Sequence, residues 1–310
     1  MGKIAFLFPG QGSQAVGMGR EWYGVDDAIT ALFDQADERL GFSLRALMSD
    51  GPEETLRQTE NAQPALVLTG LAACQWVRTR TGLKPDYVAG HSLGEYAAIA
   101  AAGGFSALDA IGLVRKRGEA MRSALPSGEG GMAAILNLDP LEVERVCREA
   151  AAETGGVCTP ANYNTSAQLV ISGHLVAVER AMALAKAVKA RCIPLPVSAP
   201  FHCSLMIKAA EIMAAVLAEQ PIQDLECPLI ANVTADEIRA GGAIRHSLVE
   251  QITAPVRWEA SMRRLLALGV ETFVELGTGQ VLAGMMKRID KNARVVTINT
   301  PADLEKLTAL

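Results

Sequence analysis

The sequence predicts an α/β protein with a large subdomain built on a parallel sheet and a small subdomain inserted into it. The first indication is a short apolar strand at 86–89 that leads through a glycine-flanked turn into an Ala-rich helix at 95–102. The second is the order of elements within 130–198, which reads strand, helix, strand, strand, helix, strand. That order is typical of a ferredoxin-like unit. We therefore expect an α/β-hydrolase-like large subdomain over 1–129 and 199–310, with the ferredoxin-like insert between them.

The turn between the first strand and its helix contains the predicted nucleophile. It reads Gly90-His91-Ser92-Leu93-Gly94, which is the G-x-S-x-G pattern. The glycines let strand and helix approach closely, and the serine between them is held in a strained conformation that projects its hydroxyl out of the sheet. The N-terminus of the following helix can hold an anionic intermediate. A strand before the motif and a helix after it favour a nucleophilic Ser92 over an incidental surface serine.

A nucleophilic serine needs a base, and the chain offers few candidates. Its four histidines are His91, His174, His202 and His246. We expect His91 to brace the turn, because its side chain points away from that of its neighbour, and we expect His174 and His246 to be capping or solvated residues. His202 lies in a strand-to-helix connection, from which a side chain can reach the carboxyl ends of a sheet. His202 is therefore the predicted general base and acid for Ser92.

The third member of the site is less clear in the sequence. No carboxylate between Ser92 and His202 stands out as the residue that orients the histidine in a hydrolase triad. Gln251 is the candidate for a neutral orienter, through either its side chain or its backbone carbonyl. A neutral partner leaves the imidazole less basic than a buried aspartate would. Such a site suits an enzyme whose acyl intermediate waits for a second acceptor.

A glycine-containing loop follows the apolar strand at 3–8 and suggests two different uses. Residues 10–15 fit the dinucleotide fingerprint with alanine in the last position. Residues 21–82, however, read as helix after helix, for example 28–40 and a helix from Pro64 to Thr79. They lack the second parallel strand and acidic residue that a Rossmann unit needs. Nicotinamide or flavin binding is therefore disfavoured. The loop better serves as one wall of an oxyanion hole, in which the backbone N–H of Gln11 joins that of Leu93.

Together these segments resemble the malonyl-CoA:acyl carrier protein transacylase family, and the resemblance covers nearly the whole chain. The segments that carry it, which are specific in their order and spacing, are 8–14, 61–65, 90–95, 115–118, 162–164, 201–202 and 275–277. The resemblance implies ping-pong transfer. Ser92 takes the malonyl group from malonyl-CoA, and the phosphopantetheine thiol of acyl carrier protein collects it, in fatty acid or polyketide biosynthesis. It implies no cofactor and no metal for the enzyme itself.

The resemblance also implies how the malonyl group is recognised. It places the malonate-binding arginine at Arg117, and a guanidinium offers paired donors to the carboxylate that distinguishes malonyl from acetyl. Arg115 and Lys116 adjoin Arg117, so at most one of the three should face the pocket. In related acyltransferase domains of polyketide synthases, a phenylalanine at the position of Phe201 goes with malonyl rather than methylmalonyl. Its ring would fill the room that an α-methyl group needs.

The small subdomain is inserted between Ser92 and His202, which predicts an active site in the cleft between the two subdomains. Asn162 and Gln168 are candidates for the wall of that cleft, where they would contact pantetheine. The alternative is that both are buried amides that form turns.

Composition limits the compartment and the partners. The net charge of −5 disfavours nucleic acid as a partner. The six cysteines have no metal-ligand spacing and suit the core of a protein in a reducing cytosol. The start of the sequence leads directly into a strand, which predicts no signal peptide, and no apolar run approaches the ~20 residues of a membrane span. We expect a cytoplasmic monomer whose partners are a coenzyme A thioester and an acyl carrier protein.

Two other functions fit parts of the pattern. A serine esterase or thioesterase that hydrolyses acyl-CoA would share the nucleophile and the base, and would differ in the final acceptor. Arg117 and the missing carboxylate orienter speak against it. A degenerate module that only binds the carrier protein would have no need for both Ser92 and His202.

Overall fold

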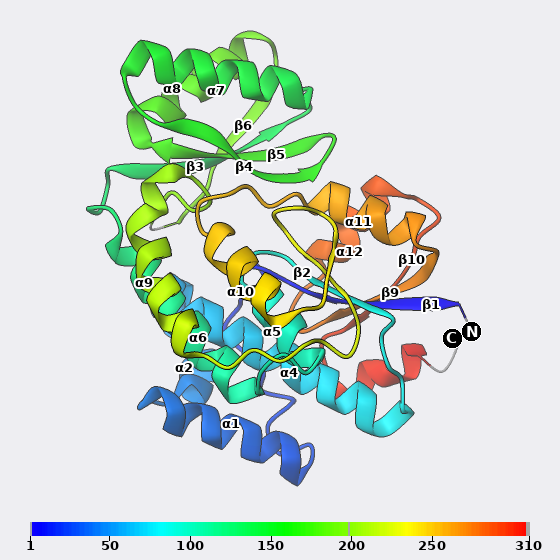
Figure 1. Cartoon of the computed structure of the whole chain (residues 1–310). Helices are drawn as coiled ribbons and strands as arrows, with labels where there is room; N and C mark the ends of the chain where they lie inside the picture. The colour runs from blue at the N-terminus through cyan, green and yellow to red at the C-terminus, as the bar shows by residue number, and fades with distance from the viewer. Residues whose placement is uncertain (1, 198, 308–310) are drawn as a thin grey trace.

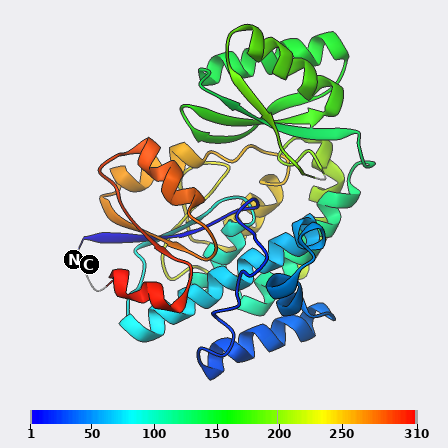
Figure 2. The same ribbon diagram turned by 180° about the vertical axis from the view of Figure 1, so that it is seen from behind.

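Two subdomains, each built on its own sheet, make up the structure (Figure 1, Figure 2). The computed structural model describes residues 2–197 and 199–307. The large subdomain holds a six-stranded sheet in the order β10-β9-β1-β2-β7-β8, and the small one a four-stranded sheet in the order β4-β5-β3-β6. Residue 198, the predicted end of the small subdomain, lies outside the described residues. No helix within the described ranges is long and apolar enough to cross a bilayer.

The large sheet is parallel apart from one short strand at its edge. Strand β1 lies between β2 and β9, and every pairing from β10 to β7 is parallel. The predicted parallel sheet is confirmed, and β8 is its one exception, since it runs antiparallel to β7. The few residues between these two strands are too short for a crossover, so the chain can only return as a hairpin. The strands are β1 (Lys3–Phe8), β2 (Tyr87–Gly90), β7 (Leu229–Ile230), β8 (Glu237–Ile238), β9 (Val270–Leu276) and β10 (Arg294–Ile298).

Helices cover both faces of this sheet, as an apolar parallel strand requires. Ile4, Phe6 and Phe8 of β1 pack into the core formed with α1, α4, α5 and α6, whereas Ala5 and Leu7 pack against α11 and α12. The α-helices of the large subdomain are α1 (Asp27–Leu40), α2 (Leu44–Asp50), α3 (Glu53–Arg57), α4 (Thr59–Thr81), α5 (Gly94–Ala101), α6 (Ala107–Ser123), α9 (Ile207–Glu219), α10 (Gly241–Glu250), α11 (Trp258–Ala267) and α12 (Val281–Ile289). Two 3-10 helices complete it, η1 (Ser204–Met206) and η2 (Pro301–Leu307).

Helix α4 contains a proline in its second turn. The sequence pattern predicts a start at Pro64, but the helix begins at Thr59. Pro64 has no N–H to donate to the carbonyl of Glu60, one turn earlier. Nη1 of Arg115, on the neighbouring helix α6, donates to that carbonyl instead, at 3.1 Å. A contact between two helices therefore replaces the hydrogen bond that the proline removes.

The small subdomain has the predicted β-α-β-β-α-β order and the strand order of a ferredoxin-like sheet, with all its pairings antiparallel. Helices α7 and α8 cover the face of its sheet that lies away from the large subdomain (Figure 1). Met132, Ala134 and Val170 on the opposite face belong to the core of the large subdomain. The elements are β3 (Gly130–Leu136), α7 (Pro140–Thr154), β4 (Cys158–Thr165), β5 (Gln168–His174), α8 (Leu175–Ala187) and β6 (Arg191–Pro194).

Gly118 sets how closely α4 and α6 can pack. A Cβ atom at this position would lie 2.5 Å from the Cα atom of Glu60, which is backbone and cannot rotate away. We predict that Gly118→Ala lowers the free energy of unfolding by about 1–3 kcal/mol, because the two helices must move apart to admit the methyl group. Urea unfolding followed by circular dichroism measures this change.

Gly284 provides the matched control for that substitution. It also lies within a helix, α12, but a Cβ atom there would meet nothing within 4 Å. Gly284→Ala should therefore raise the free energy of unfolding by about 0.5–1 kcal/mol, the usual advantage of alanine over glycine in a helix. Equal effects of the two substitutions would contradict the role given to the close helix contact.

Candidate active site

The nucleophile elbow forms where β2 ends and α5 begins. Ser92 has a φ of +52°, in the left-handed region that side chains other than glycine rarely adopt. A Cβ atom on Gly90 would lie 2.0 Å from the carbonyl carbon of Gly94, and one on Gly94 would lie 2.2 Å from the carbonyl oxygen of Phe8. Both flanking positions therefore require glycine, and the serine side chain projects from the turn as the G-x-S-x-G pattern predicts.

The structure brings Ser92 and His202 together although 110 residues separate them in the chain. Oγ of Ser92 lies 2.8 Å from Nε2 of His202. His202 has a φ of +60°, so both members of the pair lie in the left-handed region. Backbone strain of this kind costs about 1–3 kcal/mol per residue and is concentrated at functional sites. The sequence predicted strain at the serine only.

The partner of His202 is a backbone carbonyl. Nδ1 of His202 lies 2.8 Å from the carbonyl oxygen of Gln251. A carbonyl can only accept, so Nδ1 carries the ring proton and donates it, and Nε2 is free to accept a proton from Ser92. Of the two ways in which the sequence allowed Gln251 to orient the histidine, the geometry therefore favours the backbone.

The Gln251 side chain makes a different set of contacts. Its Nε2 donates to the carbonyl oxygen of Ser92 and to Oε2 of Glu95, both at 3.0 Å. Its Oε1 accepts a hydrogen bond from Nη2 of Arg117 at 2.9 Å. One fully buried residue thus contacts the histidine through its backbone, and the elbow and the arginine through its side chain.

Arg117 lies on α6 with only 1% of its surface exposed. Its Nη1 donates to Oε1 of Gln63 at 2.8 Å, and its Nη2 donates to Oγ of Ser92 at 3.1 Å as well as to Gln251. Its Nε atom is buried and has no partner among the described residues. Among the described residues, only neutral groups accept hydrogen bonds from this guanidinium. Arg115 instead pairs with Glu119, and Lys116 is exposed, so one of the three adjacent cations faces the site.

Two backbone N–H groups beside Ser92 are free to hold a developing negative charge. Within the described residues, the N–H groups of Leu93 and Gln11 have no acceptor, whereas that of Ser92 donates to Oδ1 of Asn232. The loop that carries Gln11 can approach the elbow because Gly10 has no side chain, and a Cβ atom there would lie 2.7 Å from the carbonyl oxygen of His91. Both Gln11 and Leu93 line the cavity.

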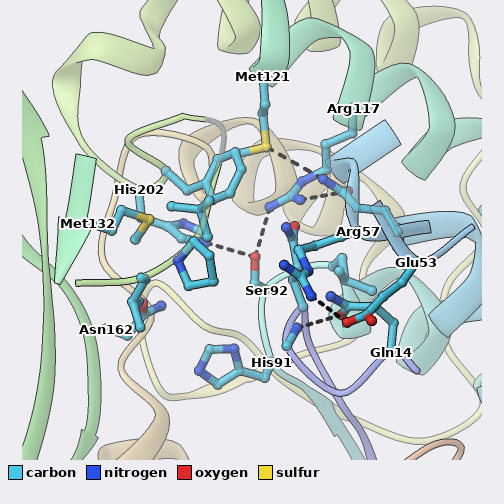
Figure 3. Close-up of a pocket in the computed structure, with 18 residues that line it drawn as sticks. Gln14, Glu53, Arg57, His91, Ser92, Arg117, Met121, Met132, Asn162 and His202 are labelled. Atoms are coloured by element: carbon cyan, nitrogen blue, oxygen red, sulfur yellow. Dashed lines mark hydrogen bonds and ion pairs between the residues drawn. The ribbon is translucent and has the colours of Figure 1, made fainter. Parts of the chain in front are cut away.

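A cavity of about 440 Å³ contains these groups, and Figure 3 shows His202 and Arg117 reaching the Ser92 hydroxyl from two sides. Apolar side chains line one part of it, and Phe201 and Asn162 are present as predicted. The lining residues are Gln11, Gly12, Gln14, Glu53, Arg57, Gln63, His91, Ser92, Leu93, Arg117, Met121, Met132, Asn162, Leu195, Pro196, Val197, Phe201 and His202.

Gln168 is not among the described residues that line this cavity, so its place in the cleft wall stays a prediction. It begins β5, at the turn from β4, where its backbone pairs with that of Thr165. Its Oε1 accepts a hydrogen bond from Nη1 of Arg288 at 3.1 Å, at an exposed position. This contact joins the small subdomain to α12 of the large one.

The other three histidines lie away from the Ser92 hydroxyl or only support the turn that carries it. Nε2 of His91 lies 2.9 Å from Oδ1 of Asn164, and the ring lies against Trp258, so His91 braces the turn as expected. His174 accepts a hydrogen bond from the backbone N–H of Val157 through its Nδ1. His246 is exposed beside Glu250.

Burial sets the protonation states in the site. Removal from water, with the charge of Arg117 as the second cause, lowers the pKa of His202 to about 3. The imidazole is therefore neutral near pH 7. Burial also lowers the pKa of Arg117 and raises the pKa of Glu95 to about 7. In the described part of the chain, no cluster of three His, Cys, Asp or Glu side chains could hold a metal ion.

Three residues that contact the site were not singled out from the sequence. Gln63 holds Arg117, Glu95 accepts from Gln251, and Asn232 holds the elbow by accepting from the N–H of Ser92 and donating to the carbonyl of Gly90. Glu95 directly follows the elbow, which was a usable signal. Asn232 lies in a loop with no recognisable pattern, and only the fold places it here.

Comparisons with known proteins agree with this geometry. The family model described as "Acyl transferase domain" matches residues 5–300. A malonyl CoA-acyl carrier protein transacylase of Bacillus subtilis (strain 168) is 46% identical, over 98% of this chain and 96% of the relative. The solved structure of such a transacylase from Coxiella burnetii superimposes with a TM-score of 0.95 at 40% identity, covering 99% of this chain and 96% of that one.

A second solved structure contains a carrier protein as well. It is described as a type II PKS acyl-carrier protein in complex with its malonyl-transacylase, and it matches with a TM-score of 0.95 at 39% identity over 98% of each chain. Family model, full-length identity and fold all agree with the residues assembled around Ser92. This chain belongs to the malonyl CoA-acyl carrier protein transacylase family.

Proposed function

We propose that this protein transfers the malonyl group of malonyl-CoA to the phosphopantetheine thiol of an acyl carrier protein, through a malonyl ester on Ser92. The observation that carries the proposal is Arg117, a buried guanidinium that donates to no carboxylate among the described residues and lies beside a serine and histidine pair. The names of the relatives supply the donor and the acceptor, and the fatty acid or polyketide pathway follows from them.

In the first half of the reaction Ser92 attacks the thioester. Oγ forms a bond to the carbonyl carbon while Nε2 of His202 takes the hydroxyl proton. The oxygen of the tetrahedral intermediate gains negative charge and accepts hydrogen bonds from the N–H groups of Gln11 and Leu93. The carbon–sulfur bond then breaks, and the coenzyme A thiolate leaves with the proton from His202. The malonyl carboxylate lies against Arg117 throughout.

The second half reverses these steps with a different thiol. The phosphopantetheine thiol of the carrier protein gives its proton to His202 and attacks the ester carbon of malonyl-Ser92. The same two N–H groups hold the oxyanion, and Ser92 regains its proton as the carbon–oxygen bond breaks. The acyl group arrives as an activated thioester and leaves as one, so the exchange needs no cofactor.

Hydrolysis is the alternative, and two features of the site oppose it. A neutral carbonyl orients His202 where a hydrolase would use a carboxylate, so the imidazolium that must form is stabilised less. The buried charge of Arg117 disfavours that imidazolium further. A thiol ionises far more easily than water and can use such a weak base.

We also infer where and in what form the protein works. The six cysteines are all free thiols in the structure, which fits the reducing cytoplasm. All the groups of the proposed mechanism come from one chain, which supports a monomer. Phe201 in the cavity wall supports malonyl over a branched acyl group, and Asn162, which lines the same cavity, would contact pantetheine.

Brief exposure to malonyl-CoA should increase the mass of the intact protein by one malonyl group. The adduct should be absent in Ser92→Ala and should disappear from the wild type when holo acyl carrier protein is added, because Ser92 is the nucleophile and the carrier thiol the acceptor. Intact-protein mass spectrometry measures both. An adduct that survives the substitution, or steady release of malonate without carrier protein, would contradict the proposal.

Arg117→Ala should lower the rate of malonyl transfer by about two orders of magnitude, because a buried carboxylate loses its paired donors. Acetyl transfer should stay similar or improve, since acetyl leaves the wild-type cation buried and unpaired. The comparison needs steady-state rates with both thioesters. Lys116→Ala, at the exposed neighbouring position on α6, is the control and should change neither rate. Equal losses for malonyl and acetyl in Arg117→Ala would argue against the assignment.

The pH dependence of acylation should reflect the lowered pKa of His202. The neutral, active form of the imidazole persists as the pH falls towards about 3, so kcat/KM should show no loss from histidine protonation between about pH 5 and 7. A bound malonyl carboxylate compensates the charge of Arg117, which removes one cause of the low pKa of His202. The acid limb of kcat should therefore lie at higher pH than that of kcat/KM. Rapid-quench acylation rates across this range test both, and an acid limb of kcat/KM near 6.5 would contradict the first.

A further inference from the structure

Glu95 is a fully buried carboxylate that no step of the proposed reaction uses. It lies in the first turn of α5, directly after the last glycine of the elbow. Its Oε2 accepts hydrogen bonds from the backbone N–H of Asn232 and from Nε2 of Gln251, both at 3.0 Å. Its Oε1 is buried without a partner among the described residues. A buried carboxylate is costly unless hydrogen bonds or an opposite charge offset its removal from water.

The contact with Gln251 decides which way the amide of that side chain faces. Its NH₂ group donates to two acceptors at 3.0 Å, Oε2 of Glu95 and the carbonyl of Ser92, and lies 3.5 Å from a third, Oδ1 of Asn232. Its oxygen points to Nη2 of Arg117. If the amide turned over, its oxygen would face the two acceptors and its NH₂ group would face the guanidinium, which has donors only. The acceptor on Glu95 therefore helps to hold the oxygen of Gln251 towards Arg117, together with the carbonyl of Ser92.

The contact with Asn232 acts on the elbow itself. Asn232 donates its backbone N–H to Glu95, while its side chain accepts from the N–H of Ser92 and donates to the carbonyl of Gly90. Glu95 thus holds, through one oxygen, the residue that fixes the nucleophile and the residue that fixes the arginine.

We propose that Glu95 is a positioning residue for malonyl selection, whose Oε2 orients the Gln251 amide so that Arg117 is held where the malonyl carboxylate binds. This inference rests on the proposed function and adds to it a residue that touches neither the substrate nor the reacting atoms. The selectivity for malonyl over acetyl then depends on a hydrogen bond of Glu95 that acts on the substrate through Gln251 and Arg117.

The position of the acceptor matters here more than its charge. Burial raises the pKa of Glu95 to about 7, so the group is partly uncharged near neutral pH. A glutamine at this position has the same length and can offer its oxygen to both donors, with its NH₂ group where Oε1 now lies. The opposite rotamer would point NH₂ at two donors and is excluded. A methionine has a similar length but offers no comparable acceptor.

The experiment compares acyl-enzyme formation from malonyl-CoA and from acetyl-CoA in the wild type, Glu95→Gln and Glu95→Met. Glu95→Met should lower the ratio of malonyl to acetyl rates by about 10- to 100-fold. This is the usual effect of losing a hydrogen bond that supports a charged binding residue, here Arg117. Most of that change should be in KM for malonyl-CoA. Glu95→Gln should keep the ratio within about threefold of the wild type, because it restores the acceptor.

Glu275 offers a matched control elsewhere in the fold. It is also a buried carboxylate with a pKa raised to about 7, and it accepts from the N–H groups of Leu282 and Ala283 at the start of α12. It does not line the described cavity. Glu275→Met should lower the melting temperature and leave the malonyl to acetyl ratio unchanged.

An unchanged ratio in folded Glu95→Met would overturn the inference, and so would equal losses in Glu95→Met and Glu95→Gln. If Glu95→Met does not fold, Glu95→Asp replaces it, since aspartate keeps the charge and withdraws the acceptor by one methylene. Glu95→Asp should then lower the ratio, and a wild-type ratio there would overturn the inference. A wild type that forms no malonyl-enzyme at all would instead contradict the proposed function, so the two failures are distinguishable.

Discussion

The burial of one positive charge beside a serine shapes the whole site. Arg117 is 1% exposed, and in the described part of the chain only neutral groups accept hydrogen bonds from it. A buried guanidinium that is hydrogen-bonded to neutral groups alone is costly, and part of the cost is recovered when an anion binds. The same charge helps to keep His202 neutral. Recognition of a carboxylate and the weakness of the catalytic base therefore have a common origin.

The close approach of backbone segments makes this arrangement possible. Gly90 and Gly94 let β2 and α5 meet the end of β1, and Gly10 lets the N-terminal loop reach the elbow. Each approach brings a free backbone N–H towards the nucleophile. The cavity then needs a wall from the small subdomain, and the open face of its sheet supplies that wall while packing into the core of the large subdomain. The insert is thus a part of the site as well as of the fold.

The sequence predicted what local patterns determine. The elbow, the order of elements in the small subdomain and the choice of His202 followed from short motifs and from the small number of histidines, and the role of Arg117 came with the family resemblance. Features that depend on long-range packing were missed or wrong. Pro64 lies inside a helix because Arg115 satisfies the freed carbonyl, and Gln168 contacts Arg288. Asn232 had no local signal at all.

The choice of a backbone carbonyl as the partner of His202 separates this site from a hydrolase with the same nucleophile. A carboxylate would stabilise the imidazolium and make His202 a strong enough base to activate water. The carbonyl of Gln251 holds the same tautomer without adding negative charge. In the proposed mechanism the malonyl ester then persists until a thiol arrives, because a thiol needs less help than water to become a nucleophile. In the proposed reaction, transfer in place of hydrolysis thus follows from the electrostatics of the base.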